Sequence, residues 1–350
     1  MKKKIAVGLS GGIDSSFAAY LLVRQGWDVV GFTLKFYPQE NRCCDLDSLY
    51  EAQRLCHKLG IPHYVIDAGE LFKKEIIAYF IESYLKGMTP NPCAFCNRFI
   101  KFGYFLEKAK SLGIDYVATG HYARIAKKKD VFLLKRAKDN KKSQEYFLSL
   151  IKPAVLGKLV FPLGNYLKEE VKKIVQKEKV IFKPRKESQD ICFVEEQSYA
   201  HFIEKNTCDF KRYEGDIRHV NGTALGKHKG IYRFTYGQRG GLGIGWSEPL
   251  YVAAIDARTN TVVVGEKKYL YKDIFLVQSL NWFSPPEKYR TIKVKIRYNS
   301  PWYDCRLKID GQVVTVSLKE KVAAITPGQI AVFYHNDMVV GAGIISKNTA

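Results

Sequence analysis

The chain has 350 residues, of which 46% are hydrophobic and 26% are charged. That length allows two or three domains with buried cores, and the composition excludes a disordered chain. No apolar run reaches the roughly 18 residues that a membrane span needs. The apolar stretch near the amino terminus, Ile5 to Leu9, is too short for a signal-peptide core. We therefore expect a cytoplasmic protein with no membrane contact.

The charge is strongly positive and unevenly distributed. Lys and Arg number 56 against 35 Asp and Glu, which gives a net charge of +21. Residues 121–190 contain 19 basic and 8 acidic residues, a net of +11. This concentration favours a polyanionic partner such as nucleic acid, although a lysine-rich solvated surface gives the same count. Eight cysteines without a secretion signal favour thiol chemistry or metal ligation over a disulfide framework.

The first part of the chain alternates apolar strands with helices. Strands are expected at IAVGL, VVGFTL, HYVIDA and DYVATGHY, and helices at 14–25, 49–60, 71–87 and 99–113. This order predicts an α/β domain with a parallel sheet over residues 1–205. The segment MTPNPCAFCN has two prolines, which place Cys93 and Cys96 in or just after a constrained loop.

The later part of the chain changes to short strands separated by Gly and Asp turns. The segments RYEGDIRHVNGTAL, GIYRFT, LYVAAID and TNTVVVGE predict a small β-rich central domain over 206–270. Stronger alternation follows in TIKVKIRY, RLKIDGQVVTVSL and QIAVFYHNDMVVGAGII, with hairpin turns expected at Asp310-Gly311 and Asn336-Asp337. These strands predict a carboxy-terminal β-barrel over 271–350.

The segment LSGGIDSS follows the first strand and opens the first helix. Gly11 and Gly12 let the backbone approach an anion, and Ser15 and Ser16 lie near the helix amino terminus, so the loop is suited to phosphates. It lacks the Lys of a Walker loop. It resembles the pyrophosphatase loop of the N-type ATP pyrophosphatases, and in that family the Asp, here Asp14, positions Mg²⁺ and pyrophosphate.

A second glycine cluster, GQRGGLGIGW, is not a dinucleotide-binding motif, because Ser247, Glu248 and Pro249 follow it and a strand begins instead of a helix. We interpret it as a glycine-rich hairpin or loop, with a functional role left open.

The cysteines divide by context. Cys93 and Cys96 form a C-x-x-C, but no second pair completes a zinc site, so catalytic thiols fit better. Cys192 lies downstream of Lys183, Arg185 and Lys186, which favour a thiolate. Cys56 and Cys305 are predicted to be small core residues, and Cys208 a loop bystander. The roles of Cys43 and Cys44, which follow the second strand, stay open.

Eight segments in order resemble the tRNA-specific 2-thiouridylase family over nearly the whole chain. They are GLSGGIDSS, MTPNPCAFCNRFIKF, ATGHYAR, SQEYFL, ESQDICF, TYGQRGGLGI, RYNSPW and TPGQIAVF. The resemblance implies a pyrophosphatase-loop domain, a central domain and a tRNA-contacting β-barrel. It also implies the activity: ATP adenylates the C2 oxygen of the wobble uridine in tRNAs of the Lys, Glu and Gln type, and persulfide sulfur replaces that oxygen.

The same resemblance implies roles for particular residues. Cys192 would carry the persulfide, and Cys96 would attack it or close a disulfide with Cys192. ATP would be held by Gly8, Leu9, Ser10, Gly11, Gly12, Ile13, Asp14, Ser15, Leu34 and Gly120, with Asp14 on the Mg²⁺. The target base would meet Asn91, Pro92 and Cys93. The rest of the tRNA would meet His121, Ser143, Gln144, Glu145, Arg297, Tyr298 and Gln329.

One position departs from the family pattern, since many members have Asp where this chain has Cys93. Three thiols suggest a second hypothesis, in which Cys93, Cys96 and Cys192 bind a 4Fe-4S cluster with one open iron that carries sulfide. The expected sulfur donor is a cysteine desulfurase or a sulfur-relay protein, and the expected oligomeric state is a monomer. The basic stretch 127–142 and the face of TIKVKIRY that carries Lys293, Lys295 and Arg297 are expected to face tRNA.

Two alternative classes of function remain at this stage. One is another pyrophosphatase-loop enzyme, either an amide-forming ligase or a thiolase that acts on a different base. The other is a non-catalytic RNA-binding protein that keeps the nucleotide fold. The intact SGGIDSS loop together with Cys96 and Cys192 favours an enzyme.

Overall fold

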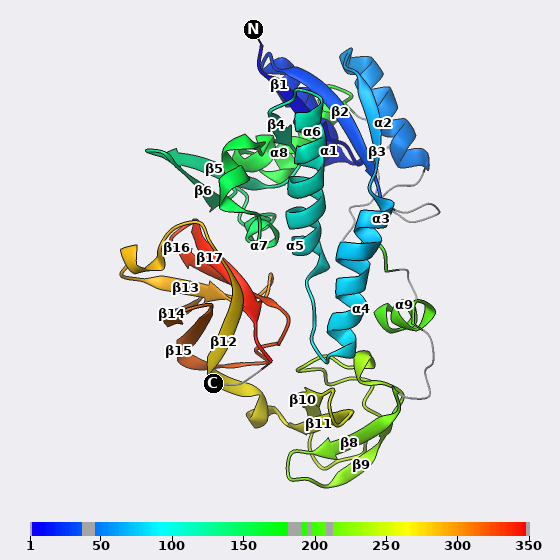
Figure 1. Cartoon of the computed structure of the whole chain (residues 1–350), viewed down its shortest axis with the longest axis vertical. Coiled ribbons are helices and arrows are strands. Elements are labelled where there is room, and N and C mark those ends of the chain that lie inside the picture. Colours follow the sequence, from blue (N-terminus) through cyan, green and yellow to red (C-terminus); the bar gives the residue numbers. More distant parts are fainter. Residues whose placement is uncertain (1, 37–45, 181–190, 195–197, 208–212, 348–350) are drawn as a thin grey trace.

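The computed structural model describes residues 2–36, 46–180, 191–194, 198–207 and 213–347. In chain order these residues form a parallel sheet covered by helices, a small antiparallel-rich sheet and a barrel (Figure 1). The sequence-based expectations for Cys43, Cys44, Cys208, Lys183, Arg185 and Lys186 lie outside the described residues. Among the described residues, no helix has the length and apolar character that crossing a bilayer requires.

The first sheet is parallel and has the strand order β3-β2-β1-β4-β7. Its strands are β1 (Lys4–Gly8), β2 (Asp28–Lys35), β3 (His63–Asp67), β4 (Tyr116–Ala118) and β7 (Leu159–Val160). Helices α1 (Ile13–Arg24), α2 (Leu46–Leu59) and α8 (Lys168–Lys177) cover one face, where Ile5 and Val7 point. Ala6, between them in the strand, points to the other face. The predicted α/β class is confirmed.

Two long helical runs cover the other face and extend below the carboxyl ends of the strands (Figure 1). The first is α3 (Gly69–Phe72), the π-helical segment η1 (Lys73–Ile77) and α4 (Ala78–Leu85). The second is α5 (Pro92–Cys96), the π-helical segment η2 (Asn97–Tyr104) and α6 (Phe105–Ser111). The second run begins seven residues before the expected start at Phe99. Pro92 occupies the first helical position, where its missing N–H costs no hydrogen bond.

The central sheet has the order β10-β11-β8-β9. It consists of β8 (Gly215–His219), β9 (Ala224–His228), β10 (Leu250–Asp256) and β11 (Thr261–Glu266). The expected strand at GIYRFT is wrong, since Ile231–Arg233 form a 3-10 turn. That turn follows Gly230, whose φ of +133° is outside the range of a strand, and it buries Ile231 and Tyr232. The second glycine cluster forms a loop before β10, as interpreted.

The carboxy-terminal strands form a barrel that closes through the pairing of β12 with β17. They are β12 (Tyr271–Trp282), β13 (Ile292–Lys295), β14 (Tyr303–Asp310), β15 (Val313–Ala323), β16 (Ile330–His335) and β17 (Met338–Ile345). The predicted hairpin turn at Asn336-Asp337 is confirmed. The other turn is shifted by one residue from the predicted Asp310-Gly311, because Asp310 pairs with Val313 and the turn is formed by Gly311 and Gln312.

A hairpin from the first part of the chain continues the barrel sheet. It consists of β5 (Ala123–Lys128) and β6 (Val131–Arg136), and β6 pairs with β17 through Lys135 and Met338. Arg124 and Lys135 also form ion pairs with Asp337 at 3.0 and 3.1 Å. From the sequence, residues 127–142 were predicted only to be a basic stretch. The hairpin therefore joins the barrel to the parallel-sheet domain.

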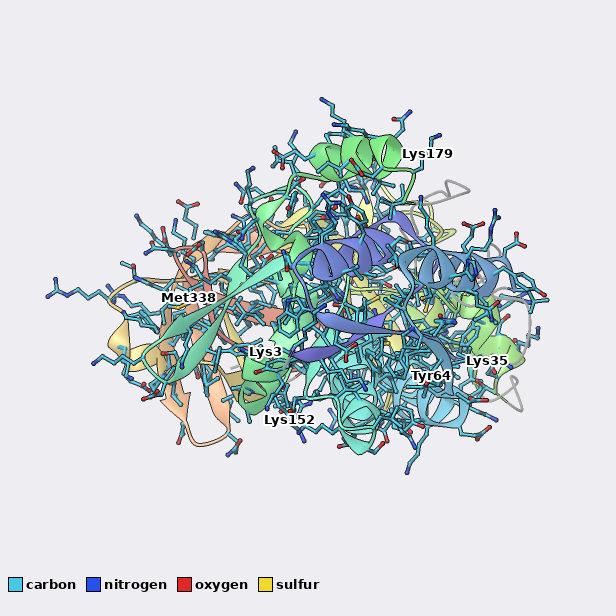
Figure 2. The ribbon with its side chains drawn as sticks, turned by 90° about the horizontal axis from the view of Figure 1, so that it is seen from above. Lys3, Lys35, Tyr64, Lys152, Lys179 and Met338 are labelled. Atoms are coloured by element: carbon cyan, nitrogen blue, oxygen red, sulfur yellow. The ribbon has the colours of Figure 1, made fainter. Side chains whose placement is uncertain are left out.

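The remaining helical segments are short. They are α7 (Glu145–Leu148), α9 (Tyr199–Lys205) and 3-10 turns at Pro153–Lys158, Pro162–Asn165, Lys267–Leu270 and Pro286–Lys288. Seen from above, Lys35 and Tyr64 lie toward one end of the molecule and Met338 toward the other, with Lys3 between them (Figure 2). The barrel thus lies away from the edge strand β3.

Candidate active site

The nucleotide loop turns sharply between β1 and α1. The Leu9 N–H donates to the Phe32 carbonyl at 2.7 Å, and Ser15 Oγ donates to the Gly12 carbonyl at 3.1 Å while lying 3.2 Å from the Ser10 nitrogen. Gly11 has a φ of +68°, and a Cβ there would lie 2.6 Å from the Ser48 carbonyl oxygen. The loop therefore requires glycine at this position for two independent reasons.

The segment after β4 approaches the same turn. A Cβ on Gly120 would lie 2.6 Å from both the Asp14 carbonyl carbon and the Ser15 nitrogen. Leu34 lies near the carboxyl end of β2 and is 8% exposed. The fold thus brings Gly120 to the loop at the edge where parallel sheets bind ligands.

A buried ammonium group, which the sequence pattern did not predict, faces the loop. Lys168 Nζ lies 2.8 and 2.7 Å from the two carboxylate oxygens of Asp14, and the Tyr122 hydroxyl donates to Asp14 at 2.9 Å. The Lys168 side chain is 4% exposed, whereas that of Asp14 is 33% exposed. Nothing in the sequence signals this pair, because Lys168 opens α8, 154 residues after Asp14.

The C-x-x-C residues lie on the first turn of the second helical run. Asn91 caps α5 by accepting the Ala94 N–H at 3.2 Å, and Pro92 takes the first helical position. Cys93 is exposed and Cys96 is 8% exposed. Asn91 and Pro92 therefore define where the helix starts. The Cys93 thiol lies at the surface, whereas the Cys96 thiol is buried.

Both cysteine-bearing segments dock on neighbouring residues of α4. Phe95, next to Cys96, stacks on Tyr79 with 3.8 Å between ring centroids. Phe193, next to Cys192, contacts Phe80 edge-on at 5.2 Å. Cys96 belongs to the hydrophobic cluster of this face, and Cys192 packs against that cluster. One helix thus organises the two thiols that the resemblance pairs, although they are 96 residues apart.

The remaining described cysteines differ from these. Burial raises the pKa of Cys56 and of Cys305 to about 12, which leaves both thiols protonated at neutral pH. Cys56 lies in α2 at 1% exposure, as expected of a core residue. Cys305 in β14 is only partly buried and packs against the barrel core. Among the described residues, which include Cys93, Cys96 and Cys192, no three His, Cys, Asp or Glu side chains are grouped as metal ligands. This arrangement gives no support to a three-cysteine cluster site.

His121 is a partly buried histidine beside the loop. Its Nδ1 lies 2.7 Å from Thr119 Oγ1, and its ring contacts Phe102 at 5.8 Å. Burial, together with the nearby Lys101, holds the pKa of His121 well below its usual range. The imidazole is therefore neutral at physiological pH and can contact RNA by hydrogen bonding but not as a cation.

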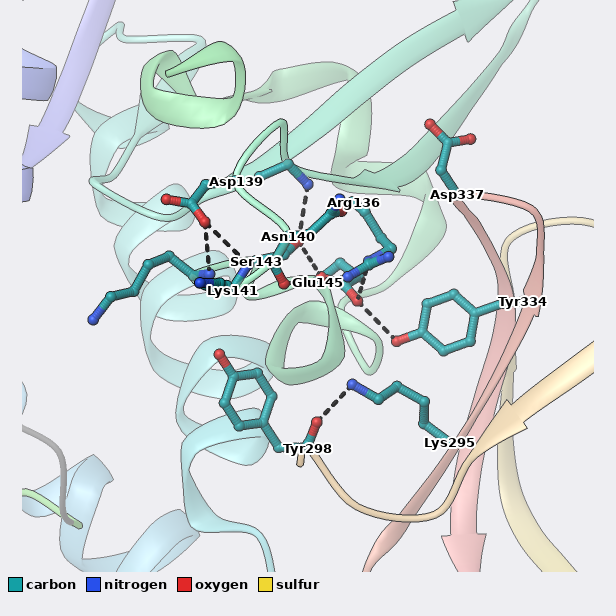
Figure 3. Close-up of polar contacts among 12 residues, drawn as sticks. Arg136, Asp139, Asn140, Lys141, Ser143, Glu145, Lys295, Tyr298, Tyr334 and Asp337 are labelled. Atoms are coloured by element: carbon teal, nitrogen blue, oxygen red, sulfur yellow. Dashed lines mark hydrogen bonds and ion pairs between the residues drawn. The ribbon is translucent and has the colours of Figure 1, made fainter. Parts of the chain in front are cut away.

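Ser143 and Glu145, two residues expected to meet tRNA, lie in a buried polar network (Figure 3). Ser143 donates to Glu145, and the Tyr334 hydroxyl of barrel strand β16 donates to the Glu145 carboxylate at 3.0 Å. Arg136 Nε lies 3.7 Å from the same carboxylate. The exposed fractions of Ser143 and Glu145 are 4% and 2%, so their side chains join domains in this structure. Gln144 between them is partly exposed.

Arg297, Tyr298 and Gln329 lie at the barrel edge that faces the parallel-sheet domain. Arg297 follows β13 and donates to the Ala324 carbonyl and, at 2.7 Å, to Thr326 Oγ1. The expectation that Arg297 shares one strand face with Lys293 and Lys295 is wrong, because the strand ends at Lys295. The Tyr298 ring contacts Phe147 in a tilted arrangement, with 4.6 Å between the ring centroids. Gln329 donates to backbone carbonyls before α5.

A cavity of about 1010 Å³ lies beyond the carboxyl ends of β2 and β3. Lys35 and Asp67, which end these strands, line it together with Arg98 and Phe99, which follow Cys96. The described residues that line it include no cysteine and none of Gly8 to Ser15, so the cavity is separate from the thiols and from the loop.

Three protein-family profiles match consecutive parts of the chain. They are described as a tRNA methyl transferase HUP domain over residues 3–196, a tRNA methyl transferase PRC-barrel domain over 201–266 and an aminomethyltransferase β-barrel domain over 272–345. The first covers more than half of the chain. Fold and loop thus define a HUP-type α/β protein with two appended β domains.

Comparison with named proteins specifies the family. The chain is 44% identical to tRNA-specific 2-thiouridylase MnmA of Aquifex aeolicus, with 99% of each chain covered. It is 42% identical to tRNA-specific 2-thiouridylase MnmA 1 of Caldanaerobacter subterraneus, again over 99% of each chain. The chain belongs to the tRNA-specific 2-thiouridylase family. Among solved structures, the U34-tRNA thiolase NcsA from Methanococcus maripaludis with its 4Fe-4S cluster matches 60% of this chain and 66% of its own, at 21% identity and a TM-score of 0.35.

Proposed function

We propose that this protein thiolates C2 of the wobble uridine in tRNAs of the Lys, Glu and Gln type, with ATP as the activating substrate. Membership of the 2-thiouridylase family supports this proposal. The observation that carries it is the docking of the Cys96 and Cys192 segments on adjacent residues of α4, below the sheet edge that bears the SGGIDSS loop.

The chemistry proceeds in two stages. The uracil C2 oxygen attacks the α-phosphate of ATP, which forms an adenylated base and releases pyrophosphate. The terminal sulfur of a Cys192 persulfide then attacks C2, and AMP leaves with the original oxygen. Cys96 thiolate attacks Cys192 Sγ, which releases 2-thiouridine and leaves a Cys96–Cys192 disulfide. A dithiol reductant returns both cysteines to thiols.

The residues around the loop divide the ATP-binding task. The backbone from Gly8 to Ser15, with Leu34 and Gly120, holds the nucleotide. Mg²⁺ commonly takes one or two carboxylates and the substrate phosphates, and the Asp14 carboxylate, one third exposed, suits it as a ligand. The bound ion would neutralise phosphate charge. The Lys168 ammonium, which lies against Asp14, is placed to meet the same phosphates when Asp14 turns to the ion.

The basic stretch 127–142 is proposed to face the tRNA. We propose that Asn91, Pro92 and Cys93 surround the target base, which must leave the anticodon stack to reach the loop. His121, Gln144 and Tyr298 are proposed to contact the neighbouring nucleotides. A cysteine desulfurase or a sulfur-relay protein supplies the persulfide, and the protein acts as a cytoplasmic monomer.

Anaerobic purification followed by iron, sulfide and zinc analysis and a single-turnover assay tests this proposal. The assay uses unmodified tRNA, ATP and a persulfide donor. We expect metal-free protein to form 2-thiouridine together with AMP. Iron near four per chain, with activity lost on cluster removal, would replace the persulfide route by the 4Fe-4S route through Cys93, Cys96 and Cys192. No thiolation of any tRNA would reject the function.

A further inference from the structure

The loop before the cysteine helix is held by the barrel. Gln329 Nε2 donates to the carbonyl oxygens of Thr89 and Pro90 at 3.0 and 3.3 Å. The Thr89 N–H in turn donates to the Pro327 carbonyl at 2.9 Å. Three hydrogen bonds thus connect one barrel turn to two consecutive residues. These residues lie immediately before Asn91, the cap of α5.

Close packing reinforces these bonds. Gly328 has a φ of +89°, and a Cβ there would lie 2.9 Å from both the nitrogen and the oxygen of Thr89. On the other side of the loop, a Cβ on Gly87 would lie 2.7 Å from Ile255 of the central domain. Two domains therefore touch the loop through glycines that allow close backbone approach.

The barrel turn itself is rigid. The Gly328 N–H donates to the Ile345 carbonyl, and the Ile345 N–H donates to the Gln329 carbonyl, so the β16–β17 ladder fixes its backbone. Arg297 anchors the preceding residues through the Ala324 carbonyl and Thr326 Oγ1. A displacement of this turn would consequently move the 88–90 segment and, with it, the start of α5.

We propose that Gln329 is a positioning residue, which sets the place of Cys93 and Cys96 by holding the backbone of Thr89 and Pro90. This role rests on the proposed function. It replaces the tRNA contact that was expected of Gln329. The barrel then serves the sulfur-transfer chemistry as well as tRNA binding. Misplacement of a reacting group by about 1 Å costs on the order of a hundred-fold in rate, so two hydrogen bonds remote from sulfur can control it.

The test uses Gln329→Met, which removes both donors at similar size and without a change of charge. We expect the single-turnover thiolation rate at saturating tRNA to fall about ten-fold to a hundred-fold, with the Kd for tRNA within two-fold of the original protein. Hydrogen exchange at the hydrogen-bonded amides of Met88, Thr89 and Ala94 should become faster in the free protein. Gln329→Lys, which keeps an N–H donor, should restore most of the rate.

Gln312→Met is the matched control, because Gln312 lies exposed in a hairpin turn of the same barrel. It should change neither rate nor exchange. A ten-fold weaker Kd with an unchanged rate at saturation would show direct tRNA contact by Gln329 and overturn the proposal. Unchanged exchange at the amides of Met88, Thr89 and Ala94 would overturn it as well. Absence of thiolation by the unaltered protein would reject the proposed function instead, while the exchange measurement would still decide the positioning role.

Discussion

The nucleotide loop and the cysteine helix lie at the same edge of the sheet but are built differently. The loop is held by its own domain, through Phe32, Ser48 and the turn that contains Gly120. The start of α5 is held from outside, through Gln329 of the barrel and close contact with Ile255 of the central domain. The geometry of the loop, which we propose holds ATP, therefore depends on one domain, whereas the position of Cys93 and Cys96 depends on all three.

This difference separates two kinds of defect. A change at the loop should impair adenylation and leave thiol reactivity intact. A change at the cysteine segments or at their supports should impair sulfur transfer and leave pyrophosphate release intact. The variants below test this separation, in order of expected effect.

The largest effect is expected from Cys192→Ser. A hydroxyl cannot carry sulfane sulfur, so 2-thiouridine formation should fall to background, while the Kd for tRNA and tRNA-dependent pyrophosphate release should persist. Mass analysis of tRNA nucleosides after a single turnover measures the product. Cys305→Ser is the matched control, since the Cys305 thiol is held protonated in the barrel and should be dispensable. Retained thiolation in Cys192→Ser would remove Cys192 from the mechanism.

Lys168→Met tests the nucleotide loop. It removes the ammonium that lies 2.7 Å from Asp14 and that we propose stabilises phosphate charge. We expect ATP-dependent pyrophosphate release to slow by about a hundred-fold, which is typical for loss of one electrostatic contact in a transition state. Lys168→Arg keeps the positive charge, so its rate of pyrophosphate release should fall less.

Lys168→Met should slow pyrophosphate release without changing the reactivity of the cysteine helix. Alkylation of Cys93 in Lys168→Met should proceed at the original rate, because α5 does not depend on α8. If alkylation and pyrophosphate release both changed, the nucleotide loop and the start of α5 would not be independent of each other.

The sequence predicted the local features and missed those that link distant segments. The strand, loop and helix around SGGIDSS follow from glycine spacing and apolar periodicity over a dozen residues. Lys168, the β5–β6 hairpin and the Glu145 network could not be predicted, because each links residues distant in the chain. Motif resemblance grouped Ser143 and Glu145 with the tRNA contacts, since it records that a residue is part of a motif and not which way its side chain points.

Glu145→Gln distinguishes a structural from a tRNA-binding role for this carboxylate. Because Glu145 is buried between Ser143, Tyr334 and Arg136, loss of its charge should lower the free energy of unfolding by about 1 to 2 kcal/mol. Urea unfolding measures this, and the exposed Glu287→Gln should show no comparable change. A weaker Kd for tRNA at unchanged stability would assign Glu145 to the RNA interface.

The last effect concerns pH, and it tests whether His121 is neutral beside the loop. Burial lowers the pKa of His121 in the folded protein, whereas in the unfolded chain the value returns to about 6.5. Unfolding therefore takes up a proton below that pH, and the free energy of unfolding should fall by up to about 1.4 kcal/mol per pH unit on acidification. His63 and His228, whose pKa values burial also lowers, contribute with the same sign.

His121→Asn should make this pH dependence shallower by up to one proton, while the same substitution at the exposed His201 should not. Urea unfolding between pH 7 and pH 5 measures both, with the buffer pH as the only variable. An unchanged slope in His121→Asn would mean that His121 protonates readily in the folded protein, and it would then be available to tRNA as a cation. A shallower slope would mean that the proposed contact of His121 with RNA is made by a neutral ring, through hydrogen bonding or stacking.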